Sequence, residues 1–263
     1  RLELWLLLID NVLHREVLAG YGGFGLAVQA YQKRAHRVID WLAKRARHLG
    51  RRISVRLVKG AYWDTEIKRA QERGLVGYPV FTRKPNTDVS YLACARVLAG
   101  STDVIYPQFA THNAHTVAYI AEMFRGVTGG FEFQRLHGMG EELYAHVVSD
   151  GQRGYPCRVY APVGAHEDLL PYLVRRLLEN GANTSFVNRI VDARQPAAAV
   201  VADPVAEVDR LVQVEHPRIP EPMRIFGGDR MNSRGVNMAD ARELRPLKIA
   251  AEKAAGAQWN ATA

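Results

Sequence analysis

The sequence predicts an α/β fold, a partial (βα)8 TIM-like barrel that holds about the last five βα units. Between residues 20 and 185 a short β-rich run, a polar loop and a stretch with helical period alternate regularly. Polar side chains gather toward or just beyond the carboxyl end of each run, as in a barrel that builds its site at one rim. No G-x-G-x-x-G turn follows any run, although an open doubly wound sheet that binds dinucleotides would carry one.

The strands are predicted by short runs with few helix-favouring residues. They cover residues 25–30, 53–58, 104–109, 131–136 and 158–161. The longest interval contains residues 66–87, which we interpret as an inserted turn of helix and a loop. Since a closed barrel needs eight strands, we expect about three strands upstream of Arg1. The start at Arg1, inside an apolar-periodic stretch, likewise indicates an N-terminally truncated fragment.

The helices are predicted by apolar stripes that recur at three and four residues, each burying one face. One stripe precedes the second strand: Ala35, Val38, Ile39, Leu42, Ala46 and Leu49. Another follows the fifth: Leu169, Leu170, Leu173, Leu177 and Leu178. The prolines of residues 196–240 predict a linker, and the alanines of 239–259 predict a helical tail. We therefore divide the chain into a partial barrel, residues 1–195, and a linker region, residues 196–263.

Composition excludes several classes of protein. The chain has 263 residues, 48% of them apolar, with 35 Lys and Arg against 27 Asp and Glu, which excludes a fully disordered protein. No apolar run reaches the roughly 20 residues that span a bilayer, and no leader opens the chain. Two cysteines are too few for a disulfide framework. We therefore expect a protein of the reducing cytoplasm.

The segment RLVKGAYWD, residues 56–64, joins a strand end to cations, a glycine and two aromatic residues. Such a group suits an anionic or electron-accepting ring, on which Tyr62 and Trp63 can stack. The alternative is that Arg56 and Lys59 form structural ion pairs at the rim.

The segment ATHNAHT, residues 110–116, places His112 and His115 three residues apart. They could bind a metal from one helix face, but the strand ends lack the carboxylates that such a site would recruit. The alternatives are a hydrogen bond from His112 to a cofactor and a structural role for His115. In LHGMGE, residues 136–141, two glycines suit either a loop close to a phosphate or ring, or a tight turn.

The helix after the fifth strand carries Tyr172, Arg175, Arg176 and Glu179. Spacings of three and four place Tyr172, Arg175 and Glu179 on one face, with Arg176 on the adjacent flank. Two guanidinium groups beside a tyrosine form a carboxylate clamp, since each presents a planar fork of donors. An outer barrel helix with an Arg175–Glu179 ion pair is equally compatible with this spacing.

Residues 33–52 are strongly basic, with Asp40 as the single acid. Such a run suits nucleic acid or an anionic membrane. It equally suits the solvated face of an outer helix, and Trp41 alone is too little for serial base stacking. We therefore expect no nucleic acid to bind through this region.

Four segments together resemble the proline dehydrogenase domain of the bifunctional bacterial flavoenzymes called proline utilization A. They are RLVKGAYWDTEIKRAQ, YPQFATHNAHT, FEFQRLHGMGE and CRVYAPVGAHEDLLPYLVRRLLENGANTSFVNRI. The resemblance covers about residues 18–190, and VADPV and HPRIP resemble that family's linker toward an aldehyde dehydrogenase domain.

The resemblance implies a barrel that holds FAD and oxidises L-proline to pyrroline-5-carboxylate, passing electrons to a membrane quinone. It implies an aldehyde dehydrogenase domain in the same parent chain, and we expect a homo-oligomer, cytoplasmic or peripheral on the inner face of the membrane, with no metal. An active-site Lys and Asp of this family belong to strands upstream of Arg1, so we expect the fragment alone to be inactive.

The resemblance also assigns residues to the site. Around the flavin it places Gln29, Arg56, Val58, Lys59, Gly60, Ala61, Trp63, Thr82, Lys84, Thr111, His112, Gln134, Glu179, Ser185 and Phe186. Around the substrate it places Tyr62, Leu136, Tyr160, Tyr172, Arg175 and Arg176. Two other functions stay open on the residues alone: a metal-dependent barrel hydrolase that uses His112, His115 and His137, and a basic module that binds nucleic acid or membrane.

Overall fold

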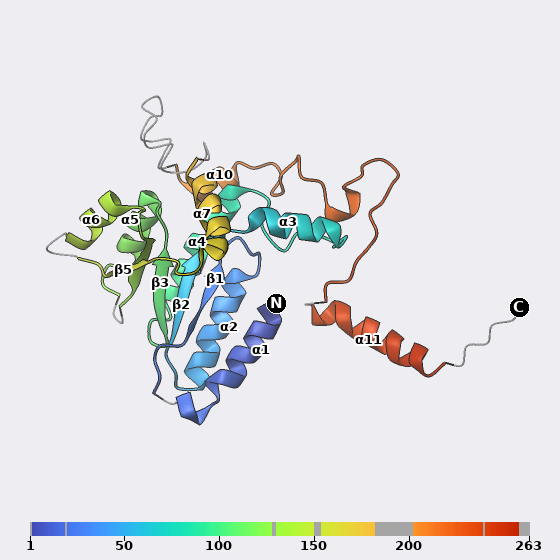
Figure 1. Cartoon of the computed structure of the whole chain (residues 1–263), viewed down its shortest axis with the longest axis horizontal. Coiled ribbons are helices and arrows are strands. Elements are labelled where there is room, and N and C mark those ends of the chain that lie inside the picture. The colour runs from blue at the N-terminus through green and yellow to red at the C-terminus, as the bar shows by residue number, and fades with distance from the viewer. Residues whose placement is uncertain are drawn as a thin grey trace, which may run out of the picture. The chain divides into compact units, whose positions relative to one another are not determined.

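A computed structural model of the chain describes residues 2–18, 20–127, 130–149, 154–181, 202–238 and 240–257. Helices and strands alternate through most of it (Figure 1). In chain order the elements are α1 (Leu2–Leu13), η1 (Glu16–Leu18), β1 (Gly25–Gln29), α2 (Ala35–His48), β2 (Ile53–Val58), α3 (Trp63–Glu72), α4 (Lys84–Ala99), β3 (Ile105–Ala110), α5 (Ala114–Met123), β4 (Glu132–Leu136), α6 (Glu141–Ser149), β5 (Cys157–Tyr160), α7 (His166–Gly181), α10 (Pro204–Asp209), η2 (Pro222–Arg224) and α11 (Ala241–Ala255).

The strands form one parallel sheet in the order β1-β2-β3-β4-β5, with each strand hydrogen-bonded to the next along the chain. The predicted α/β fold is confirmed, and the five predicted strands are found within a residue or so of their expected bounds. A sequential parallel order with helical crossovers is the arrangement from which a βα barrel is built. Among the described residues the sheet does not close into a barrel.

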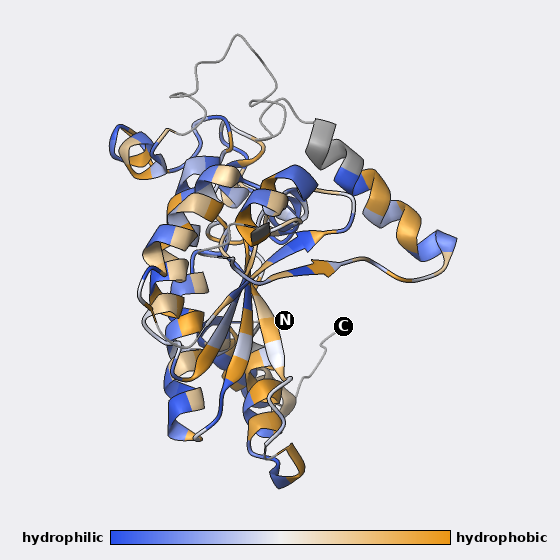
Figure 2. Cartoon of the chain, turned by 90° about the vertical axis from the view of Figure 1, so that its left-hand side faces the viewer, coloured by the Kyte–Doolittle hydropathy of each residue, from blue (hydrophilic) through white to orange (hydrophobic). Residues whose placement is uncertain are grey.

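The two faces of the sheet differ in chemistry, and hydrophilic and hydrophobic residues alternate along its strands (Figure 2). On β2, Ile53, Val55 and Leu57 are fully buried, on the side where α2 and α4 pack against the sheet and each other. Ser54, Arg56 and Val58 point to the opposite face because successive side chains in a strand alternate. Register then places a residue of β1 beside each of the three, and a residue of β3 beside Ser54 and Arg56.

Aromatic side chains fill the core beside β3 and β4. The Phe109 ring lies 5.4 Å from that of Phe124 and 5.7 Å from that of Phe131, both edge-on. The Phe133 ring lies 5.3 Å from Phe131 and 6.0 Å from Tyr155, again edge-on. Edge-to-face pairs add to the burial of apolar area, so this cluster fixes the strands on which the candidate site depends.

The interval between β2 and β3 contains more helix than the sequence predicts. Instead of one turn, α3 extends over Trp63–Glu72, and residues 84–87 already belong to α4. Asp64 and Glu66 lie in the first turn of α3, where negative charge complements the helix dipole. Pro85, at the start of α4, has the fixed φ that helix initiation favours. These terminal residues favour helix initiation at both places, so the prediction of a single helical turn and a loop was too short in helix.

The apolar stripe of α7 is less buried than predicted. Leu170 and Leu173 expose 48% and 50% of their surface, and no described segment covers them, so the predicted burial of this face is wrong for these two residues. In the stripe of α2, Ala35, Val38, Ile39, Leu42 and Ala46 are buried as predicted, whereas Leu49, just after the helix, is only partly buried.

The chain divides into two compact units, which we describe separately. One comprises Tyr21–Ala61 and Arg83–Val214 and contains the sheet; the other comprises Arg1–Gly20, Tyr62–Thr82 and Glu215–Ala263. In the second unit the Tyr78 hydroxyl donates to the carbonyl of Pro220 at 2.7 Å. The Asn232 amide donates to the carbonyls of Gln71 and Pro222. Part of the region predicted as a linker therefore packs on the segment that contains α3.

The Ala-rich tail forms a helix, α11, as the sequence predicts. The described part of the chain contains no helix with the length and apolar character needed to cross a membrane.

Candidate functional site

One face of the sheet carries most of the predicted site residues that lie on strands. Arg56 is level with Gln108 on β3, and Gln134 with Arg158 on β5. Leu136 is level with Tyr160, and Gln29 with Val58. Because register and alternation place these side chains on one face, the sheet brings together residues that are more than 130 positions apart in sequence.

Arg56 stacks on Tyr160, the last residue of β5. The guanidinium carbon lies 4.3 Å from the centroid of the Tyr160 ring, within cation–π distance. The Arg56 Nε is buried and has no hydrogen-bond partner among the described residues. A buried donor without an acceptor is costly unless a bound group satisfies it, so this position favours an acceptor from a ligand.

Lys59, which follows β2, forms an ion pair with Asp88 of α4. Both side chains are partly buried. The structural ion pair that the sequence leaves open is therefore present for Lys59, whereas for Arg56 the structure shows stacking on an aromatic ring.

Gly60 has a backbone that a larger residue could not adopt at this position. Its φ is +126°, and a Cβ would lie 2.6 Å from the Tyr31 ring. Tyr31 is buried at 2% exposure, and its N–H donates to the carbonyl of Lys59. A glycine is therefore required where the chain leaves β2.

We expect Gly60→Ala to destabilise the protein by about 3 kcal/mol, since positive φ costs about 1–2 kcal/mol and overpacking a further 1–3. Gly50→Ala is the matched control, because Gly50 has φ +61° and nothing within 4 Å of a Cβ, so only the cost of its backbone applies. Thermal unfolding of both variants checks this. Equal losses of stability would contradict the role assigned to the Tyr31 contact.

His112 follows β3 and is held by the backbone of β4. Its Nε2 accepts the N–H of Leu136 at 3.1 Å, which leaves the ring proton on Nδ1. Burial, followed by the positive charges of Arg176, Arg135 and Arg56, lowers the pKa of His112 to about 4. His112 is therefore a neutral Nδ1–H donor near pH 7, next to Thr111, whose carbonyl accepts the Tyr144 hydroxyl at 2.7 Å.

This pKa predicts a pH-dependent stability. The unfolded chain protonates His112 near pH 6.5 and the folded chain near 4, so the contribution of His112 is complete above pH 6.5 and is lost as the pH falls toward 4. The slope is at most about 1.4 kcal/mol per pH unit. Thermal midpoints of wild-type protein and His112→Gln should converge between pH 6.5 and 4. A constant difference over that range would contradict a neutral His112.

The clamp residues of α7 gather around one ring. The guanidinium carbons of Arg175 and Arg176 lie 5.3 and 5.5 Å from the centroid of Tyr172. Arg176, predicted on the adjacent flank, is therefore as close to Tyr172 as Arg175 is. Because the charge of Arg176 also lowers the pKa of His112, α7 brings positive charge to the carboxyl edge of the sheet. A cluster of arginines at this edge suits an anionic ligand.

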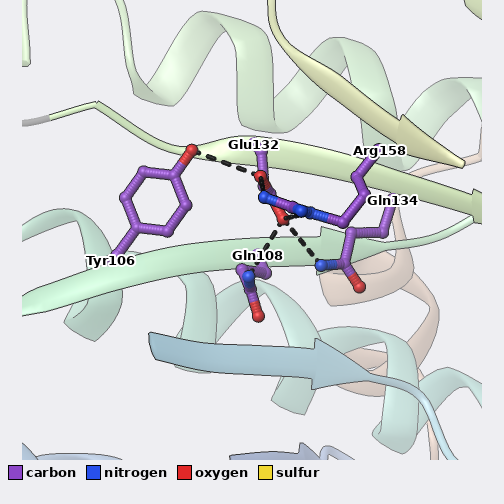
Figure 3. Close-up of polar contacts among 5 residues, drawn as sticks. All are labelled: Tyr106, Gln108, Glu132, Gln134 and Arg158. Carbon is purple, nitrogen blue, oxygen red and sulfur yellow. Dashed lines mark hydrogen bonds and ion pairs between the residues drawn. The ribbon is translucent and has the colours of Figure 1, made fainter. Parts of the chain in front are cut away.

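A buried acid on β4 was not singled out from the sequence. Glu132 is 4% exposed and accepts hydrogen bonds from Gln108, Gln134 and Arg158 (Figure 3). A signal was available, because the strands carry polar side chains at i and i+2, as in Tyr106 with Gln108, which predicts one polar face.

Three predicted site residues belong to the second unit. The Trp63 indole donates to the carbonyl of Phe81 at 2.7 Å, and the Thr82 hydroxyl accepts the N–H of His216 at 2.9 Å. Tyr62 precedes α3 and is 53% exposed.

In the first unit, Ala61 and Lys84 are exposed. Ser185 and Phe186 lie outside the described residues, as does the Glu179 side chain.

The geometry gives little support to the two alternative functions, a metal-dependent hydrolase and a basic module that binds nucleic acid or membrane. Among the described residues, no three His, Cys, Asp or Glu side chains gather closely enough to hold a metal ion, and the Nε2 of His112 is already engaged by a backbone N–H. In the basic run, Arg47 forms a two-bond ion pair with Asp103 and Lys44 pairs with Asp40. These pairs are typical of a solvated helix face.

The fold defines a parallel α/β protein of the βα-barrel class, and arginine side chains gather at the carboxyl ends of its strands. Residues 1–189 match the family described as Proline dehydrogenase. The chain belongs to the proline dehydrogenase family.

Similar proteins agree with this assignment. The chain is 54% identical to the Bifunctional protein PutA of Salmonella typhimurium, over 99% of this chain and 21% of that protein. It is 30% identical to mitochondrial Proline dehydrogenase 1 of Caenorhabditis elegans, over 65% of this chain and 29% of that protein. A crystal structure of bifunctional proline utilization A matches all of this chain and 26% of its own, with a TM-score of 0.91 and 54% identity. The chain thus spans about a fifth of the length of the bifunctional relative.

Proposed function

We propose that the chain carries the proline-oxidising site of an FAD-dependent proline dehydrogenase, which converts L-proline to pyrroline-5-carboxylate in proline catabolism. The observation that carries the proposal is the cationic edge made by Arg56, neutral His112 and the Arg175–Arg176 pair, in a chain of this family. The reaction removes a hydride from a ring carbon bonded to nitrogen and a proton from that nitrogen, leaving a C=N bond.

The donors on this face fit a flavin. The buried Nε of Arg56 lacks an acceptor among the described residues, and His112 presents a neutral N–H. When bound, FAD supplies the acceptor for the hydride. Arg56 and Lys59 would hold the ring that gains negative charge, and preorganised cations of this kind stabilise developing charge most effectively where water is excluded. His112, Gln134, Thr111 and Gln29 would supply further hydrogen bonds to the cofactor.

The substrate groups follow from the chemistry of proline, a zwitterion with one carboxylate and an apolar ring. Arg175 and Arg176 would bind the carboxylate through their planar forks. Leu136, Tyr160 and Tyr172 would enclose the ring. Leu136 is buried, at 5% exposure, and would give the proline ring an apolar contact held in place by the core. Positioning of this kind lowers the barrier to hydride transfer without a covalent nucleophile.

The remaining parts of the proposal concern the whole protein. We propose that electrons pass from the flavin to a membrane quinone, that the parent chain also carries an aldehyde dehydrogenase domain, and that the protein is a homo-oligomer in the cytoplasm or at the inner face of the membrane. These features rest on the resemblance to the bifunctional proline utilization A family.

An anaerobic titration tests the proposal. The full-length protein that carries this sequence should be yellow, and its flavin absorbance should bleach on addition of L-proline but not of D-proline. A colourless protein would contradict the cofactor. A yellow protein that stays oxidised with proline would contradict the substrate. Zinc analysis of the same sample separates this function from the metal-dependent hydrolase.

A further inference from the structure

Glu132, at the start of β4, accepts hydrogen bonds from three strands. The Arg158 Nε and Nη2 donate to its Oε1 and Oε2 at 2.8 and 2.9 Å. The Gln108 and Gln134 amides donate to Oε1 at 2.9 and 2.7 Å, and the Tyr106 hydroxyl lies 3.4 Å from Oε2. The carboxylate is buried at 4% exposure. Its position thus ties β3, β4 and β5 together on the polar face.

This carboxylate is ionised at neutral pH. Burial alone would raise its pKa, but the hydrogen bonds from Arg158 and Gln134 and the charge of Arg158 outweigh burial and lower the pKa below its ordinary value. An ionised carboxylate accepts hydrogen bonds and donates none. Every group that faces Glu132 must therefore present an N–H or O–H to it.

That requirement fixes the orientation of Gln134. Its amide nitrogen must face Glu132, so its Oε1 turns away from the acid, as Figure 3 shows. Rotating the amide by half a turn would bring two oxygens together, which costs a buried hydrogen bond and adds repulsion. Gln134 therefore offers an acceptor oxygen in one fixed direction.

Gln134 lies on the face that carries the candidate site. It is 6% exposed, is level with Ala110 at the end of β3, and precedes by two residues Leu136, whose N–H binds His112. We infer that Glu132 is a positioning residue, which holds the Gln134 amide so that its oxygen accepts an N–H or hydroxyl of the cofactor. This inference rests on the proposed function, since it assigns the acceptor to FAD.

The test is Glu132→Gln in the full-length protein, with FAD affinity measured by titrating apoprotein. A glutamine at position 132 can donate as well as accept, so the Gln134 amide is no longer held in one orientation. We expect the FAD dissociation constant to rise about tenfold, the effect of losing one buried hydrogen bond. Glu122→Gln is the matched control, because Glu122 pairs with Arg125 on an exposed surface; it should bind FAD as wild type does.

A double-mutant cycle separates positioning from a general structural role. In a Gln134→Met background, Glu132→Gln should change FAD affinity less than twofold, because the group through which Glu132 acts is already absent. Equal effects in both backgrounds would mean that Glu132 acts through the fold at large and would overturn the inference.

Glu132→Asp is the second variant if Glu132→Gln does not fold. Aspartate keeps the negative charge opposite Arg158, but its shorter side chain withdraws from Gln134. We therefore expect the same loss of FAD affinity for Glu132→Asp. In the Gln134→Met background this loss should again be absent. If the wild-type protein binds FAD and is reduced by proline, but the Glu132 variants bind FAD as tightly as wild type does, this inference alone is overturned. A wild-type apoprotein without affinity for FAD overturns the proposed function with it.

Discussion

Replacing Arg175 or Arg176 by alanine in the full-length protein should raise the dissociation constant for L-proline about 100-fold and leave FAD bound. Each variant would lose the charge-assisted hydrogen bonds that one guanidinium donates to the substrate carboxylate, which are worth about 1.5–3 kcal/mol. The two arginines lie at similar distances from the Tyr172 ring, 5.3 and 5.5 Å, so we expect similar losses. Anaerobic titration of the flavin spectrum with proline measures both variants.

Two controls make this result specific. Arg125→Ala removes an exposed arginine that pairs with Glu122 and should leave proline binding unchanged. Arg175→Lys keeps the charge but not the planar fork, and should recover only part of the affinity. If proline binds both alanine variants as it binds wild type, the carboxylate clamp is wrong and α7 is an outer barrel helix.

The strands were predictable because their chemistry is local. The run Ile53–Val58 alternates between fully buried and partly exposed residues, and such alternation is visible in any window of six residues. The same holds for the stripe of α2. The length of α3 was not predicted, although Asp64 and Glu66 in its first turn favour a helix start at this place.

The site was predictable only in part, because register is not a local property. The spacing on α7 was sufficient to expect Arg175 beside Tyr172. No spacing indicates that Arg56 would stack on Tyr160, 104 residues later, since that contact depends on three intervening strand pairings. Glu132 was missed for the same reason. The polar pair Glu132 and Gln134 on β4 indicates a polar face, but the neighbours of Glu132 on the adjoining strands, Arg158 and Gln108, depend on strand register.

Arg56→Met should slow reduction of the flavin by proline about 100-fold, because removing one preorganised donor to developing charge typically costs a factor of 10²–10³. The guanidinium is held over Tyr160 at 4.3 Å and its buried Nε lacks an acceptor among the described residues. Methionine has a similar length and removes a buried donor, so folding should be little affected. Stopped-flow reduction measures the rate, and thermal unfolding of the apoprotein measures the stability.

Arg52→Met is the matched control, since Arg52 precedes the same strand and also stacks on a ring, that of Tyr106 at 5.4 Å. It makes the same chemical change at the opposite end of β2, so flavin reduction should stay at the wild-type rate. A second readout is the reduction potential of the bound flavin. Losing a cation that favours the reduced form should lower it by tens of millivolts, at about 30 mV per 1.4 kcal/mol for two electrons. A wild-type rate together with an unchanged potential would remove Arg56 from the mechanism and leave its stacking on Tyr160 as a purely structural contact.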